Sequence, residues 1–133
     1  MSRVFVNPLT ELAEYEELNR DLNRGKGPVQ ISGCMDSQKV HLMYELGEET
    51  GVPWKLVVTY DDQRAREIYD DFRSFTEDVW LYPAKDLLFY SADIHGNLMT
   101  RQRIAVWRHL MEEKEGVVVT TLDGLMDHLL PLV

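Results

Sequence analysis

The sequence contains almost no cysteine and no long apolar run, and both absences limit what the protein can be. Cys34 is the only cysteine among 133 residues, so neither an intrachain disulfide nor a cysteine cluster around a metal can form. No segment approaches the ~18 consecutive apolar residues that a membrane-spanning helix needs. The first residues become acidic where a secretory signal would need an apolar core. These features predict a cytoplasmic protein that does not bind a membrane.

Basic residues are also scarce. The chain has 14 lysines and arginines against 23 aspartates and glutamates, which gives a formal net charge of −9. Such a chain repels nucleic-acid phosphates unless a local basic patch overrides the field. One candidate patch consists of Arg101, Arg103 and Arg108. Because Glu112 and Glu113 follow directly, a solvated helix face is the favoured interpretation, and a DNA-contacting module built on the three arginines is the alternative.

The composition itself is that of a globular protein, with 44% hydrophobic residues. The length fits a single domain over residues 1–133. Strands are expected over residues 28–32, 54–60, 79–82 and 117–121. Helices are expected over residues 9–24, 38–49, 62–75, 98–114 and 122–130. Short apolar strands that alternate with helices predict a three-layer α/β fold, with a parallel sheet between helices, and ligands in such folds bind at the carboxyl ends of the strands.

The first expected strand leads into a segment that partly matches the phosphate-loop pattern G-x-x-x-x-G-K-[ST]. Gly33 and Lys39 match the pattern in identity and spacing. Gln38 stands where the second glycine belongs, so the backbone could not wrap a phosphate as closely. Val40 replaces the hydroxyl that ligates Mg²⁺, and Asp36 adds a negative charge. The pattern therefore predicts a phosphate loop that has lost its chemistry, with a chance match as the alternative.

This segment, called the degenerate loop below, comprises Gly33, Cys34, Met35, Asp36, Ser37, Gln38, Lys39 and Val40. Asp36 and Ser37 are expected to cap the helix that begins near Gln38. Lys39 could hold an anion at the start of that helix, but a surface remnant beside Asp36 is the favoured interpretation. For Cys34, a small buried or half-buried residue is favoured over a reactive thiol.

Signs of catalytic or metal chemistry are weak elsewhere. The four histidines are dispersed, and the pair Asp93 and His95 lacks a third ligand. Asp61 and Asp62 fit helix caps better than an acid–base couple. No serine–histidine–aspartate or cysteine–histidine arrangement can be argued. We therefore expect no catalytic residue and no metal site, although a small α/β ATPase that uses an unusual loop is an alternative function.

Three segments resemble the N-terminal region of bacterial transcription-repair coupling factors. The first is the run from NPLTELAEYEEL to VHLMYEL, over residues 7–46. The second, over residues 81–110, is more specific: a strand that ends in YPAKD precedes a tyrosine-bearing loop and a helix of R-x-x-x-L type. The third is GVVVTTLDGLMDHLLP, over residues 116–131. The resemblance covers nearly the whole chain.

This resemblance implies both a fold and a function. The region is similar to the first domain of UvrB and hence to P-loop domains of the RecA and helicase type. UvrB keeps an intact phosphate loop, whereas the coupling factors do not. The parent would be an ATP-driven translocase on double-stranded DNA that displaces stalled RNA polymerase and recruits UvrA. ATP and Mg²⁺ would belong to motor domains beyond residue 133, and this excised fragment would bind no cofactor.

The resemblance also indicates where the fragment would make its contacts. The candidates for contact with other domains of the parent form an aromatic set at the carboxyl edge of the sheet: Tyr82, Pro83, Lys85, Asp86, Phe89 and Tyr90. UvrB-like folds carry a DNA-gripping hairpin in this neighbourhood, but residues 89–97 are too few to build it. Thr120 and Thr121 stand where helicases touch the nucleic-acid backbone, and Asp123 opposes that role. Packing against the parent protein is therefore favoured over DNA contact.

Overall fold

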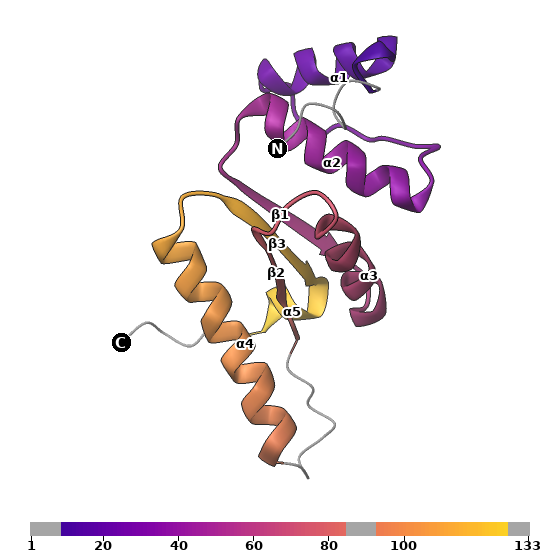
Figure 1. Ribbon diagram of the computed structural model, residues 1–133. Helices are drawn as coiled ribbons and strands as arrows, with labels where there is room; N and C mark the ends of the chain where they lie inside the picture. The colour runs from indigo at the N-terminus through magenta and orange to yellow at the C-terminus, as the bar shows by residue number, and fades with distance from the viewer. Residues whose placement is uncertain (1–8, 85–92, 128–133) are drawn as a thin grey trace. The chain divides into compact units, whose positions relative to one another are not determined.

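The computed structural model describes residues 9–84 and 93–127 (Figure 1). The chain divides into two compact units, Met1–Val52 and Pro53–Val133, and each is described by itself. The single domain expected over residues 1–133 stays a prediction. Within the described residues, no helix combines the length and the apolar character that crossing a membrane requires.

The first unit is a pair of helices. A short 3-10 helix, Leu9–Glu11, precedes α1, Ala13–Asn23, and α2 runs over Asp36–Thr50. The helix expected over residues 9–24 is interrupted at Leu12, whose backbone is extended. α1 and α2 pack against each other. Gly51 ends α2 with a left-handed φ of 66°, a conformation that costs glycine least.

The strand expected over residues 28–32 does not form, so that prediction was wrong. These residues have no regular secondary structure, and Val29 and Ile31 are 43% and 46% exposed. An alternating apolar pattern favours a strand only when a neighbouring strand and a buried face are present. Pro28 also removes one backbone donor from any ladder. The pattern alone could not show that this segment lacks a strand partner.

The second unit contains an open three-stranded parallel sheet. Its strands are β1, Trp54–Thr59, β2, Val79–Tyr82, and β3, Gly116–Thr121. Their order is β1-β3-β2, so β3 pairs with a strand on each side. The three corresponding predictions were therefore correct to within one residue, and the predicted α/β class with a parallel sheet is confirmed.

Helices cover this sheet from both sides. They are α3, Asp62–Phe72, α4, Asp93–Glu112, and the short α5, Leu122–Met126. Figure 1 shows α3 and α4 on opposite sides of the strands. α4 places Val106 against Val118 of β3 and Tyr82 of β2 in the core. The opposite helix, α3, buries Ala65, Ile68 and Phe72.

The helices of the second unit also differ in length from the expectation. α4 begins at Asp93, five residues before the expected start at Leu98, and so continues through Gly96. A glycine inside a helix costs only about 1 kcal/mol, which the packing of the later turns against the sheet outweighs. α3 ends at Phe72 rather than Phe75. α5 ends at Met126, and the backbone of Asp127 is extended. Residues 128–130 of the expected final helix lie outside the described residues, as does one helical turn that the sequence also predicts near residues 86–88.

An aromatic cluster closes the amino-terminal end of the sheet. The rings of Trp54 and Trp80 lie 5.7 Å apart and tilted, and Trp80 stacks on His109 of α4 at 4.6 Å. Gly116 begins β3 beneath these rings. A Cβ atom at Gly116 would lie 2.8 Å from Cζ3 of Trp54 and still closer to Cζ3 of Trp80. The two indoles therefore occupy the space that a side chain at residue 116 would need.

We predict that Gly116→Ala lowers the free energy of unfolding by about 1–3 kcal/mol, because two bulky rings would have to move. Urea denaturation followed by tryptophan fluorescence measures the change. Gly27→Ala is the matched control, since no atom lies within 4 Å of a Cβ built there. Equal stability of the Gly116 variant and the wild type would show that the cluster is loosely packed.

Candidate functional site

The degenerate loop runs directly into α2, and its residues serve the start of that helix. The N-cap is Met35, not the expected Asp36 or Ser37. The Oε1 atom of Gln38 accepts a hydrogen bond at 3.1 Å from the backbone N–H of Met35. Asp36 is the first helical residue, where its charge suits the positive end of the helix dipole. Gln38, which fills the place of a phosphate-loop glycine, therefore acts as a helix-capping residue.

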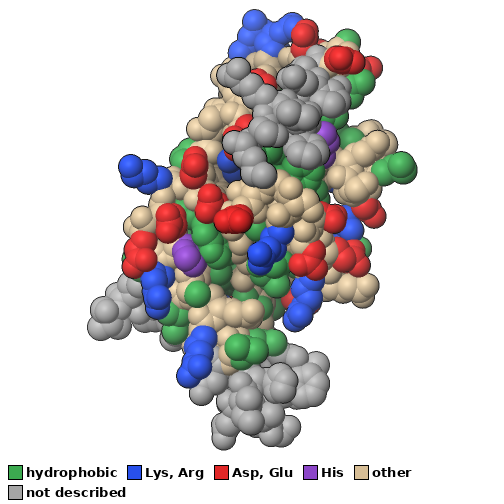
Figure 2. Space-filling model, viewed as in Figure 1, with side chains coloured by type: hydrophobic (Ala, Val, Ile, Leu, Met, Phe, Trp, Pro, Cys, Tyr) green, Lys and Arg blue, Asp and Glu red, His purple; other side chains and the backbone are tan. Residues whose placement is uncertain are grey.

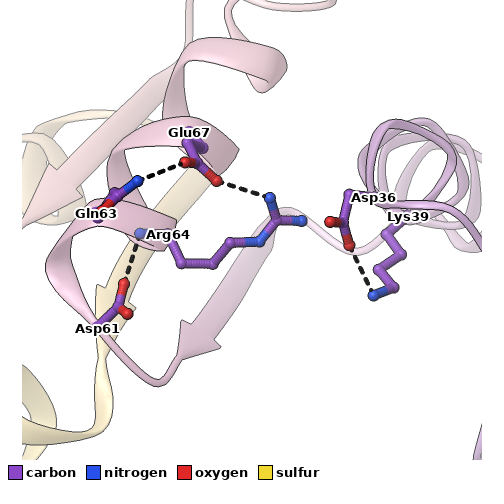
Figure 3. Close-up of polar contacts among 6 residues, drawn as sticks. All are labelled: Asp36, Lys39, Asp61, Gln63, Arg64 and Glu67. Carbon is purple, nitrogen blue, oxygen red and sulfur yellow. Dashed lines mark hydrogen bonds and ion pairs between the residues drawn. The ribbon is translucent and has the colours of Figure 1, made fainter.

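Lys39 and Val40, at the last two positions of the phosphate-loop pattern, also have structural roles. The Nζ atom of Lys39 lies 2.9 Å from Oδ1 of Asp36, one turn back on the helix (Figure 3). Both side chains are exposed, so this pair adds about 0–1 kcal/mol of stability. Val40 is fully buried and offers no oxygen to a metal. Cys34 is half-buried, and Gly33 has a φ of 83°.

The carboxyl edge of the sheet is the second place to look for a site, because ligands of such folds bind there. Thr120 and Thr121 end β3 there and are almost fully buried. The hydroxyl of Thr120 donates to the backbone carbonyl of Tyr82 at 2.8 Å, while the hydroxyl of Thr121 accepts from the N–H of Gly124 at 3.1 Å. Both hydroxyls are therefore engaged within the protein rather than presented to a phosphate backbone.

Arg103 joins three parts of this edge. Its Nη1 atom lies 2.8 Å from Oδ2 of Asp127, just after α5, and 3.4 Å from the carbonyl oxygen of Pro83. Its guanidinium also lies 4.6 Å from the centre of the Tyr82 ring, close enough for a cation–π interaction. The Arg103 side chain is only 8% exposed. We call this arrangement of Arg103, Asp127, Tyr82 and Pro83 the arginine clasp.

The arginine clasp changes how the expected sites are interpreted. Arg101 and Arg108 are exposed, but Arg103 is buried, so the three arginines do not share one surface. Of the aromatic contact set, Tyr82 and Pro83 are also buried. The other members, Lys85, Asp86, Phe89 and Tyr90, lie outside the described residues.

The polar residues that follow β1 stabilise the first turn of α3. The Asp61 side chain accepts a hydrogen bond at 2.7 Å from the N–H of Arg64 (Figure 3). Nη1 of Arg64 lies 2.9 Å from Oε2 of Glu67, whose other oxygen, Oε1, accepts a hydrogen bond from Nε2 of Gln63 at 3.2 Å. The helix cap predicted for Asp61 is confirmed. No acid–base couple is evident in this group.

Glu45 of α2 is an unusual residue that the sequence did not reveal. It is fully buried, and among the described residues neither carboxylate oxygen has a hydrogen-bond partner. Nε2 of His41 lies 4.0 Å from Oε2 of Glu45. The buried hydroxyl of Tyr15 in α1 likewise has no partner within the described part of the chain. The helical spacing of the sequence did not indicate that Glu45 is buried, because a glutamate among charged neighbours is expected to be solvated.

Burial raises the pKa of Glu45, with the charge of His41 opposing and that of Glu49 reinforcing the effect. Burial also raises the pKa of Tyr15, with further contributions from Glu45 and Glu49. Both shifts favour the neutral form of the side chain, as expected where low polarity disfavours charge. The folded chain therefore holds the proton of Glu45 more tightly than the unfolded chain does.

Metal ligands add no further candidate site within the described residues. Over residues 9–84 and 93–127, no group of three or more histidine, cysteine, aspartate or glutamate residues could hold a metal ion. Figure 2 shows acidic and basic side chains interspersed on the face in view. Comparisons with protein-family profiles, curated proteins and solved structures found no significant match to this chain.

We predict that Glu45 makes stability depend on pH. Because the folded chain holds this proton more tightly, the stabilisation is present below the usual glutamate pKa of about 4.3 and is lost as pH rises through the raised value. We expect the free energy of unfolding, measured between about pH 4 and 8, to decrease less steeply with rising pH in Glu45→Gln than in the wild type. Glu16→Gln, at an exposed position of α1, should keep the wild-type slope.

We predict that Arg103→Ala destabilises the protein by about 2–4 kcal/mol, because it leaves Asp127 without its partner and removes packing against Tyr82. Arg108→Ala, on the exposed side of the same helix, should change stability by about 0.5 kcal/mol or less. Thermal and urea denaturation provide the measurement. A similar loss of unfolding free energy in the two variants would contradict the structural role of the arginine clasp.

Proposed function

We propose that this chain is a non-catalytic contact domain, the UvrB-like N-terminal module of a bacterial transcription-repair coupling factor. Support for the family comes from the sequence resemblance of residues 7–46, 81–110 and 116–131. In the proposal, the parent is an ATP-dependent translocase on double-stranded DNA. It displaces stalled RNA polymerase and recruits UvrA for nucleotide excision repair, and this module acts as a scaffold for the parent's other domains.

The observation that carries the contact role is the use of the degenerate loop by α2. A working phosphate loop needs backbone N–H groups free to surround the phosphates, a lysine that reaches them and a hydroxyl for Mg²⁺. Here Gln38 caps the helix, Lys39 pairs with Asp36 and Val40 is buried. Each side chain needed for nucleotide chemistry is replaced or engaged in holding the helix.

The small parallel sheet also supports this proposal. A P-loop domain is a parallel sheet covered by helices, and three such strands with α3 and α4 on the two sides fit the coarse pattern. Leu56 and Val58 of the edge strand β1 are 60% and 43% exposed. Exposed apolar residues on a sheet are suited to packing against a neighbouring domain.

A calorimetric titration of ATP with Mg²⁺ into this chain tests the absence of nucleotide chemistry. We expect no binding heat and no ATP turnover, for the wild type and for Lys39→Ala alike. Loss of the surface pair with Asp36 should change stability by about 1 kcal/mol at most. Micromolar binding that Lys39→Ala abolishes would instead establish the ATPase alternative.

The parental assignment has a separate test. The reading frame downstream of Val133 should encode a helicase-type motor with an intact phosphate loop. A stop codon directly after Val133 would remove the coupling factor from consideration, while a contact role for the chain would still stand on the calorimetric result.

A further inference from the structure

The outward side of α4 carries a regular series of exposed residues. Arg101, Ile104, Arg108 and Met111 follow one another at steps of three, four and three residues, which aligns them on one side of the helix. Ile104 is 49% exposed and Met111 64%. Both arginines are exposed as well. We call these four residues the outer stripe.

The opposite side of α4 faces the sheet. Arg103 and Val106 are buried, and Trp107 and Leu110 pack against the cluster that contains Val118. Figure 1 shows α4 alongside the strands, with one side turned away from them. The apolar residues of the outer stripe therefore have no role in the core of their own unit.

The two arginines of the outer stripe have no ion-pair partner within the described part of the chain. Lys39, Arg64 and Arg103, in contrast, each pair with a carboxylate at 2.8–2.9 Å. Glu112 follows Arg108 by one helical turn, but no ion pair joins them. In a chain with a net charge of −9, two unpaired cations on one helix face form a local site for carboxylates.

We propose that the outer stripe docks an acidic amphipathic helix of a partner protein, an inference that rests on the contact role proposed above. Steps of three and four residues match the seam along which two helices pack. Ile104 and Met111 would bury against apolar side chains of the partner. Arg101 and Arg108 would pair with its carboxylates while their aliphatic stems cover the seam.

Charge and chemistry favour a protein partner over a nucleic acid. Phosphate binding makes no use of the apolar positions Ile104 and Met111. The neighbouring Glu112 and Glu113, together with the net charge of −9, repel a phosphodiester backbone. An acidic helix, in contrast, uses all four residues of the outer stripe.

The test uses a fluorescent synthetic peptide of about three heptads, with leucine at one seam position and glutamate at the other. Its glutamates oppose self-pairing of the peptide. A second peptide carries lysine in place of those glutamates, and a labelled DNA duplex is the third probe. Fluorescence anisotropy at low and at moderate salt reports binding of each probe to the 133-residue chain.

We expect the glutamate peptide to bind and the lysine peptide and the duplex not to bind. Arg108→Glu should weaken binding at least about tenfold, and Ile104→Ser should have a similar effect. Arg66→Glu, the same change at an exposed position of α3, should leave affinity unchanged. The double variant Arg101→Glu/Arg108→Glu should bind the lysine peptide instead, which a merely structural role of the arginines would not produce.

Three results would overturn the inference. They are absence of glutamate-peptide binding, equal loss of affinity in Arg66→Glu, and arginine-dependent binding of the duplex alone. Circular dichroism of each variant verifies that it remains folded. None of these results changes the nucleotide titration, so failure of the docking surface is distinguishable from failure of the non-catalytic role.

Discussion

The structure of the second unit depends on the central strand β3. Each of its six residues, Gly116–Thr121, is buried, and among the described strands β1 and β2 each pair with β3 and not with each other. At its start, Gly116 leaves space for the indoles of Trp54 and Trp80. At its end, Thr120 is tied to the end of β2. The same strand thus determines the packing at both the amino and the carboxyl ends of the sheet's strands.

The sequence was sufficient to predict features that local pattern determines. Unbroken apolar runs located β1 and β3, and Asp61 was recognised as a helix cap. The strand expected over residues 28–32 failed because alternation does not reveal whether a partner strand exists. The burial of Glu45 and Arg103 was also missed. Charged residues are almost never buried unless their surroundings compensate for the loss of water, and those surroundings come from distant parts of the chain.

The two places that match phosphate-loop and helicase patterns, where we expected neither phosphate nor DNA contact, share a physical property. In the degenerate loop, the side chain of Gln38 caps a helix, and at the carboxyl edge the hydroxyls of Thr120 and Thr121 satisfy buried backbone groups. Polar groups held by internal hydrogen bonds are costly to redirect toward a ligand. Exposed side chains that have no partner within their own unit, such as those of the outer stripe, are therefore better candidates for a functional surface.

The strand order has a consequence for the synthesis of the chain. β1 and β2 emerge from the ribosome first, but they do not pair with each other. Their ladders can close only when β3, near the carboxyl terminus of the 133 residues, has been translated. Until then, the strand edges of roughly 60 residues of nascent chain stay unpaired while synthesis proceeds at about 5–20 residues per second, which leaves them open to pairing with other chains.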